Sequence, residues 1–374
     1  MKRLVSLLAA VLAFVSLSAQ EQQPTFSGKM KSEQIREACA AVSNWQIDNF
    51  DQVTHSRIGW HNGALYIGMS YWADYAADAK AEDFLMGIGK EYKWGLSYAK
   101  MSHIYHADYI CVGQMYLEMY KKHKKENMIQ PLKERAFYVA SHPSKAALSK
   151  NDPVGKSSRW SWCDALFMAP PVYAGLYTVT GEQVYKDYLM NEYKESTDSL
   201  YDRSEALYYR DCKRIKLREP NGAKQFWARG NGWVFGGIPL ILNNLPADDP
   251  DRAYFEQIFK EMAEAVVRTQ DGKGHWHTSL LDMETYPEPE NSGSAFFCYG
   301  LAWGINNGIL DGAKYKKTLK KGWEALVGSV HPDGKLGYVQ PVGSAPKKAD
   351  YNSTEVYGVG AFLLAGVELL KMVE

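Results

Sequence analysis

The sequence has few cysteines, and their positions predict neither a metal site nor a redox motif. The 374 residues include five cysteines, an odd number, and no C-x-x-C pair occurs. We expect buried free thiols, with Cys163 a neighbour of the functional site and not a nucleophile; the five are Cys39, Cys111, Cys163, Cys212 and Cys298. His275 and His277 flank Trp276, but no third ligand has a recognisable spacing, so a turn with two surface histidines explains them better than zinc.

The sequence also lacks an excess of charge of either sign and, after its first residues, any long hydrophobic run. The 43 basic and 43 acidic residues give no electrostatic footprint for nucleic acid or for an anionic membrane surface. No later segment approaches the roughly 20 apolar residues that a transmembrane helix needs. Hydrophobic residues make up 46% and charged residues 23%, which is ordinary for a globular protein. We expect a soluble mature protein without a nucleic-acid or membrane partner.

The first nineteen residues have the order of a cleavable signal peptide. The charged pair Lys2-Arg3 precedes an apolar run at 4–15, and small residues follow at 16–19. No cysteine lies beside the cleavage site, so a lipid anchor is not expected. The pattern predicts export to the periplasm, with an N-terminal extension at residues 20–33.

Aromatic side chains are abundant, and many occur in a recurring kind of segment. The 11 tryptophans and 25 tyrosines have the apolar faces and polar tips that suit sugar rings, although they also fill large cores. Six times, a loop with aromatic and polar residues runs directly into an apolar helix rich in small residues. The six segments begin at Trp60, Ile104, Trp160, Phe226, Glu290 and Tyr351. Their spacing, roughly 45 to 65 residues, fits one helix pair with its loops.

The stretches between these segments have a one-sided apolar stripe that is typical of outer helices. Examples are residues 32–50, 131–142, 251–270 and 313–330. The alternation predicts an all-α barrel, a toroid of six helical hairpins formed by residues 34–374 as one domain. A stacked solenoid is the alternative.

The polar residues of every repeat precede the inner helix, so closing the ring gathers six loops at one mouth. We place the functional site there, with Trp60 on its wall. Four glycines of these segments are expected to allow tight backbone turns: Gly63, Gly230, Gly232 and Gly293.

One of the six segments, WSWCDALFM, carries the first candidate acid. It places Trp160, Trp162 and Asp164 at a helix entrance, with Met168 one turn further on the same face. Ser161 and Asp164 also form an S-x-x-D pattern, so spacing alone supports a helix cap at least as well as catalysis.

A second acid lies at another helix entrance, in YHADYICVG, which contains His106 and Asp108. Alone, Asp108 fits a cap or a first-turn carboxylate. Two carboxylates brought from separate repeats to one mouth raise the pKa of one of them, and this leaves a protonated acid beside an ionised partner. Such a pair is equipped for general acid catalysis.

The segment FWARGNGWV supplies a cation among aromatics. Arg229 and Trp233 lie one turn apart and can face one cavity, with Trp227 beside them. The planar fork of an arginine suits the carboxylate of an acidic sugar. The alternative is a structural arginine stacked on tryptophan.

These motifs, with HADYICVGQMYLE, LLDMETYPEPENSGSAFF and TEVYGVGAFLLAG, resemble glycoside hydrolase family 105, the unsaturated rhamnogalacturonyl hydrolases, and its relatives acting on unsaturated glucuronides. The resemblance is collinear from about Gln34 to the C-terminus; W-x-D-x-L-F-M and W-x-R-G-x-G-W are its most specific parts. It implies a six-hairpin α/α barrel and hydration of the C4=C5 double bond of a terminal unsaturated uronic acid. An acid protonates C4, water adds at C5, and the hemiketal opens and expels the remaining chain.

The resemblance also implies the roles of individual residues. Asp164 matches the family's acid and base, and Asp108 its supporting carboxylate; the pocket positions are Trp162, Met168, Trp227, Arg229, Gly230 and Trp233. Arg210 stands where the rhamnogalacturonan enzymes have a histidine, so galacturonides and rhamnose-linked glucuronides are both candidate substrates. The reaction needs no metal or cofactor, because proton transfer and water activation suffice.

Two other classes of function are compatible with such a barrel. A sugar epimerase or isomerase would depend on histidines at the mouth, where His61, His103 and His106 are the candidates. A non-catalytic glycan-binding protein would use the aromatic pocket without an acid, and the presence of both Asp108 and Asp164 argues against it.

Overall fold

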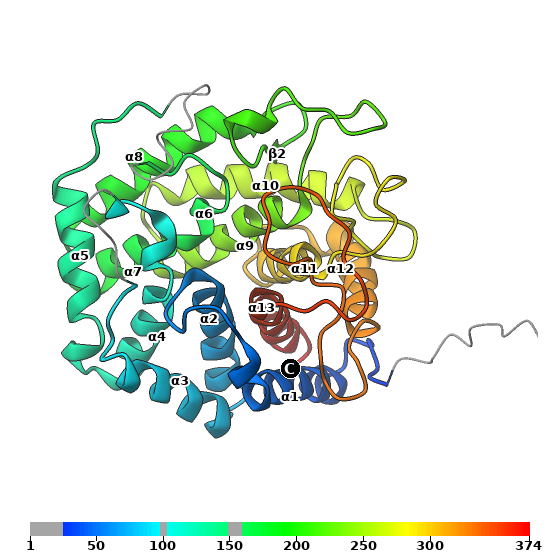
Figure 1. Cartoon of the computed structure of the whole chain (residues 1–374), viewed down its shortest axis with the longest axis horizontal. Helices are drawn as coiled ribbons and strands as arrows, with labels where there is room; N and C mark the ends of the chain where they lie inside the picture. The colour runs from blue at the N-terminus through cyan, green and yellow to red at the C-terminus, as the bar shows by residue number, and fades with distance from the viewer. Residues whose placement is uncertain (1–24, 98–102, 149–158) are drawn as a thin grey trace, which may run out of the picture.

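In the part of the chain that the structure describes, six outer and six inner helices alternate and form a closed ring (Figure 1). The computed structural model describes residues 25–97, 103–148 and 159–374. The outer helices are α1 (Ser32–Asp48), α3 (Ala79–Glu91), α5 (Gln130–Ser141), α8 (Gln183–Leu200), α10 (Arg252–Arg268) and α12 (Gly312–Val327). The inner helices are α2 (Trp60–Tyr75), α4 (Gly113–His123), α7 (Pro170–Thr180), α9 (Ala228–Asn244), α11 (Asn291–Asn306) and α13 (Val356–Val373).

The inner helices contact one another in the order α2, α4, α7, α9, α11, α13, and α13 contacts α2 again. The predicted all-α toroid of six hairpins is therefore confirmed, and the solenoid is excluded because the ring closes. The C-terminal Glu374 adds to the closure, since its carboxylate accepts a hydrogen bond from Arg36 of α1 at 2.9 Å.

Short elements connect the helices at the two ends of the barrel. The helical ones are α6 (Ala165–Met168), η1 (Phe50–Gln52), η3 (Ala107–Ile110), η4 (Glu126–Met128) and η6 (Cys212–Arg214). The strands β1 (Tyr201–Asp202) and β2 (Leu207–Tyr208) form a small antiparallel pair in which Tyr201 lies opposite Tyr208.

The N-terminal boundary differs slightly from the prediction. Helix α1 begins at Ser32, and the Phe26 side chain packs in the core, so part of the predicted extension belongs to the barrel. The predicted signal peptide lies outside the described residues.

The apolar composition of the inner helices is explained by burial on all sides. Helix α13 is long and apolar enough to cross a membrane by length and composition, but 83% of it is buried inside the barrel. A Cβ on Gly68 of α2 would lie 2.0 Å from the carbonyl oxygen of Gly360, so glycine lets α2 and α13 approach closely. Helix α13 is thus the core helix of this fold.

The four glycines expected in turns lie inside helices instead, and none has a positive φ. A Cβ on Gly63 would lie 2.9 Å from Cys111 Sγ, and one on Gly293 2.9 Å from the backbone of Ala228. These glycines, with Gly230 and Gly232, therefore serve close helix packing. The prediction was wrong because a glycine in an apolar helix and a glycine in a tight turn look alike in sequence.

Candidate active site

Asp164 directly precedes α6, and its carboxylate makes no capping hydrogen bond to that helix. The alternative that Asp164 is a helix cap is therefore wrong. The loop that carries it is paired with a second segment: the Cys163 N–H donates to the Arg210 carbonyl at 2.8 Å, and Trp162 forms an antiparallel bridge with Asp211. Asp164 is only 8% exposed, so its side chain lies in a largely enclosed position.

The Arg210 guanidinium lies against this carboxylate. Its Nε donates to Asp164 Oδ2 at 3.3 Å, and its Nη1 donates to Asp211 Oδ2 at 2.8 Å. Burial alone would lower the pKa of Arg210, but Asp164 and Asp211 raise that pKa above its ordinary value. The charged partner seen against Asp164 is thus a cation, whereas the sequence suggested a second carboxylate.

Asp108 lies on η3, which packs against α6. His106 Nδ1 accepts a hydrogen bond from the Asp108 N–H at 3.3 Å and lies 3.8 Å from Asp108 Oδ2. The His106 ring also contacts the Trp162 ring, with centroids 4.7 Å apart. The structure therefore brings the two acid-bearing loops together at one end of the barrel, with His106 and Trp162 between them.

Arg229 is 1% exposed and lies between two aromatic rings, 4.4 Å from the centroid of Trp227 and 4.8 Å from that of Tyr357. Both of its Nη atoms donate to backbone carbonyls, those of Gln340 and Pro341. The fork expected to bind the substrate carboxylate is thus occupied by the protein's own backbone. The structure shows the stacked arrangement that the sequence left as the alternative.

Gln340 is the residue that holds this part of the site, and no motif in the sequence points to it. Its Oε1 accepts from Trp227 Nε1 at 2.8 Å and from Thr278 Oγ1 at 2.9 Å. Its backbone carbonyl accepts from Arg229 and from the Tyr357 hydroxyl. The sequence analysis missed Gln340 because it lies in an irregular loop, outside every recurring segment.

The other expected pocket residues lie deeper than the acids. Trp233 is fully buried against Phe167 and Phe296, with ring centroids 4.7 and 4.8 Å away. Met168 is buried as well, and its carbonyl accepts from Gln114 at 3.3 Å. Trp233 and Met168 therefore form the packed layer behind the site.

Gly230 brings α9 close to the residue beside the candidate acid. A Cβ at this position would lie 3.0 Å from the Trp227 ring and 3.1 Å from Cys163 Sγ. Burial, followed by the Asp164 charge, raises the pKa of the Cys163 thiol well above its ordinary value. Because the thiolate is the nucleophile, Cys163 is not equipped for nucleophilic catalysis.

His61, one of the three histidines expected at the mouth, is poorly suited to acid–base catalysis. His61 stacks on Trp60 and on His55, with centroids 3.6 and 3.9 Å apart. Burial, together with the charges of His55 and Arg229, lowers the pKa of His61 to about 3. A catalytic acid–base group works best with a pKa near the working pH. This environment therefore argues against an epimerase that depends on His61.

The remaining candidate ligands are structural. His277 is 6% exposed; its Nε2 lies 3.3 Å from Asp271 Oδ2, so the expectation of two surface histidines was wrong for His277. Among the described residues, no group of three or more His, Cys, Asp or Glu could hold a metal ion. All five cysteines are free thiols, four of them buried and Cys212 partly exposed.

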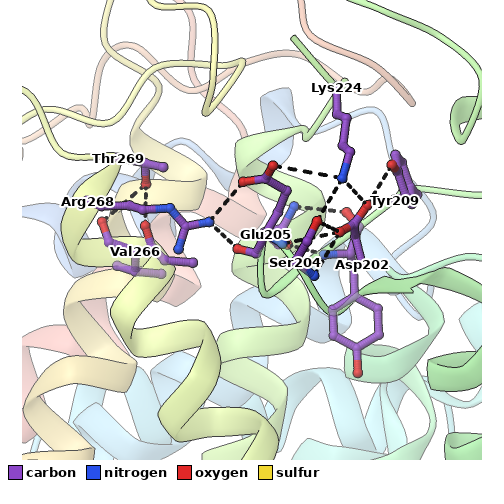
Figure 2. Close-up of polar contacts among 11 residues, drawn as sticks. Asp202, Ser204, Glu205, Tyr209, Lys224, Val266, Arg268 and Thr269 are labelled. Carbon is purple, nitrogen blue, oxygen red and sulfur yellow. Dashed lines mark hydrogen bonds and ion pairs between the residues drawn. The ribbon is translucent and has the colours of Figure 1, made fainter.

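A polar network fastens the segment that carries Arg210, as Figure 2 shows. Lys224 Nζ donates to Asp202 Oδ2 at 2.8 Å and so joins the two ends of the segment. The Tyr209 hydroxyl donates to the same oxygen at 2.9 Å, and Arg268 of α10 forms an ion pair with Glu205 at 3.2 Å. The cation beside Asp164 is therefore held by a closed loop anchored on α10.

Replacing Asp202 with Asn should loosen this loop in a pH-dependent way. Burial alone would raise the pKa of Asp202, but hydrogen bonds from Lys224, Ser204 and Tyr209 hold it well below its ordinary value. The free energy of unfolding should therefore fall by about 1 to 3 kcal/mol at neutral pH. Because the folded pKa is depressed, the difference between the variant and the wild type should shrink as the pH falls below about 4.

Urea denaturation at several pH values measures this effect, and Asp248→Asn at an exposed position is the control. A difference that stays constant from neutral to acid pH would show that the Asp202 carboxylate has no charged role.

The comparisons with known proteins concern the fold and the family of the chain. The model of glycosyl hydrolase family 88 matches residues 38–373. An unsaturated 3S-rhamnoglycuronyl hydrolase of Formosa agariphila is 39% identical over 326 residues, covering 84% of this chain and 85% of that protein. A second enzyme of that name, from an Alteromonas species, is 32% identical over 95% of this chain and 89% of its own length.

Solved structures show the same fold over almost the whole chain. A structure described as a polysaccharide lyase has a TM-score of 0.82 and 32% identity, covering 91% of this chain and 98% of that one. A family 88 glycosyl hydrolase from Bacteroides vulgatus has a TM-score of 0.80 and 30% identity, covering 91% and 99%. A family 105 structure from C. acetobutylicum, with a TM-score of 0.71 and 21% identity over 88% and 98%, supports the fold alone.

The family model spans nearly the whole barrel, and two relatives exceed 30% identity over most of both chains. The chain therefore belongs to glycosyl hydrolase family 88 and is a GH105-like glycoside hydrolase of the unsaturated uronyl hydrolase type.

Proposed function

We propose that this hydrolase removes a terminal 4,5-unsaturated glycuronic acid from rhamnose in lyase-generated oligosaccharides, with Asp164 as the acid and base. The observation that carries the proposal is the placement of Asp164 at the mouth, without a capping bond and with Arg210 Nε 3.3 Å from its carboxylate. A carboxylate without a structural bond to its helix is available for proton transfer.

The Arg210 contact holds the Asp164 carboxyl group in place for proton transfer. Asp164 then protonates C4, and water adds at C5 as its proton passes to Asp164. The C5 hemiketal opens to a ketone, and the hemiacetal at C1 collapses and releases the rhamnose hydroxyl.

The relatives favour the substrate class of the rhamnoglycuronyl hydrolases over that of the rhamnogalacturonyl hydrolases. The two relatives named as rhamnoglycuronyl hydrolases are 39% and 32% identical to this chain. An unsaturated rhamnogalacturonyl hydrolase of Bacillus subtilis is 25% identical over 56% of this chain. Arg210, which stands where rhamnogalacturonan enzymes have a histidine, points the same way.

Export to the periplasm is part of the proposal. The charged, apolar and small-residue order of residues 1–19 supports it. A small site at the mouth suits the trimming of short oligosaccharides after their import.

The absorbance of the conjugated double bond tests the function directly. Incubation with the unsaturated disaccharide that a lyase leaves from a glucuronate–rhamnose glycan should abolish this absorbance, and the disaccharide from rhamnogalacturonan, which differs in its linkage to rhamnose, should react more slowly. Absorbance that persists with both substrates would contradict the proposal. Absorbance that rises on an intact polysaccharide would instead show lyase activity, the function in the description of one structural neighbour.

A further inference from the structure

Arg214 lies at the mouth, one short turn beyond the cation that contacts the candidate acid. It ends η6, whose first turn is held by Asp211: Asp211 Oδ1 accepts from the Lys213 N–H at 3.0 Å, and the Arg214 N–H donates to the Asp211 carbonyl at 2.9 Å. Asp211 is the residue that also binds Arg210. Arg214 is therefore fixed relative to the Asp164–Arg210 pair by a short run of backbone.

The side chain of Arg214 crosses to the loop on the other side of the site. Its Nη2 donates to Ser344 Oγ at 3.4 Å and its Nη1 to Gln225 Oε1 at 3.3 Å. Ser344 follows Gln340 and Pro341, whose carbonyls hold Arg229. The Arg214 guanidinium thus lies between the segment that positions Asp164 and the segment that positions Arg229.

The guanidinium of Arg214 has no acidic partner within 4.0 Å among residues 25–97, 103–148 and 159–374. By contrast, Arg210 has two carboxylates, and Arg268 has that of Glu205. A guanidinium carries five N–H donors, and the two contacts that Arg214 makes are long and go to neutral oxygens. It therefore keeps the charge and the planar fork that bind carboxylate and sulfate groups.

We propose that Arg214, assisted by Gln225 and Ser344, forms a binding site for an oxyanion of the glycan, either the uronate carboxylate or a sulfate ester on the neighbouring sugar. This site would bind part of the proposed substrate, so its biological role rests on the proposed function. Arg229 cannot take this role in the observed geometry, because its Nη atoms bind backbone carbonyls. Arg210 is already shared between Asp164 and Asp211.

The test compares Arg214→Met and Arg214→Lys with a matched control, Arg218→Met. Arg218 lies in the same segment, is exposed, and donates only to the carbonyls of Ile215 and Leu217. On the preferred oligosaccharide, Arg214→Met should raise KM by about 10- to 100-fold and change kcat little. Arg214→Lys keeps the positive charge but loses the planar fork, so its KM should lie between that of the wild type and that of Arg214→Met.

Three substrates separate the two sources of the oxyanion: unsaturated glucuronyl-rhamnose with a sulfate ester on the rhamnose, the same disaccharide without sulfate, and its uronate methyl ester. If Arg214 binds sulfate, the wild type prefers the sulfated disaccharide and Arg214→Met abolishes that preference. If it binds the uronate, Arg214→Met weakens both acidic substrates, and the methyl ester shows no further loss in the variant.

Binding of inorganic sulfate, measured by calorimetry at constant ionic strength, gives a result that does not depend on turnover. Wild type and Arg218→Met should bind it, and Arg214→Met should not. If sulfate binds but no disaccharide is consumed, the proposed function fails and the oxyanion site stands. Sulfate binding and KM values that are equal in wild type and Arg214→Met would overturn the site.

Discussion

Asp164→Asn should lower kcat by about 10²- to 10⁴-fold, the range that positioned acid–base groups supply. The amide cannot donate a proton to C4 or accept one from water, whereas its size and shape are those of the carboxyl group. KM should therefore change little. The initial rate at which the conjugated double bond loses its absorbance measures both constants.

The fold should survive this change, because Asp164 makes no capping bond and its ion pair with Arg210 is its one charged contact in the described structure. Asp248→Asn, at an exposed position, is the matched control and should keep full activity. Full activity in Asp164→Asn would move the acid to another residue, and Asp108→Asn would then be the next variant to measure.

The fold could be predicted almost completely because the same unit, an outer helix followed by a loop and an inner helix, occurs six times in the described structure. Most of each inner helix is buried, whereas each outer helix is buried on one side, so their compositions differ visibly. Helix α13 is buried from Val356 to Leu370, whereas α12 alternates buried Leu319 and Trp323 with exposed lysines. The gathering of the polar loops at one end of the barrel could be predicted because each of these loops precedes an inner helix. Within the fold, the role of the helical glycines was wrong, and part of the predicted N-terminal extension belongs to the barrel.

The site was predicted less completely, because long loops decide which side chains meet. The motifs and the family resemblance singled out Asp164, Asp108, Trp162 and Arg229 as candidates. They could not show that Arg229 would donate to the carbonyls of a loop more than a hundred residues later. That loop carries Gln340, and no periodic pattern marks it. Contacts of this kind depend on tertiary structure, which neither spacing nor composition encodes.

For Arg210, the sequence and the structure each contribute an observation. The sequence marked it as a departure from related enzymes, and the structure places its Nε 3.3 Å from Asp164. A departure next to an acid changes the charge around that acid, so it bears on proton transfer as well as on the choice of sugar. The same segment supplies Arg214, which the sequence did not single out.

A large loss of stability is expected when the buried ion pair of Arg159 is broken. Arg159→Met should lower the free energy of unfolding by about 3 to 5 kcal/mol at neutral pH, the cost of leaving one partner of a buried ion pair alone. Arg159 Nε lies 2.8 Å from both carboxylate oxygens of Glu192, and the Glu192 side chain is 1% exposed. Arg159 directly precedes Trp160, whose carbonyl accepts from Ser196, so the pair joins the Asp164 loop to α8.

The loss should depend on pH because of Glu192. Burial raises the pKa of Glu192 above its ordinary value even though Arg159 lowers it. Without Arg159 the folded state should bind a proton at Glu192 more readily still. A carboxyl whose folded pKa lies above its unfolded pKa destabilises the fold as the pH rises, so the loss should be greatest at neutral pH and smaller below about pH 4.

Urea denaturation of two further variants separates this mechanism from a general loss of packing. Arg203→Met removes an exposed ion pair, with side chains 77% and 74% exposed, and should cost less than about 1 kcal/mol. The double variant Arg159→Met/Glu192→Met removes both buried charges and should recover much of the stability lost in Arg159→Met. If the double variant is no more stable than Arg159→Met, the buried charge of Glu192 is not the cause, and the lost contacts of the arginine stem are.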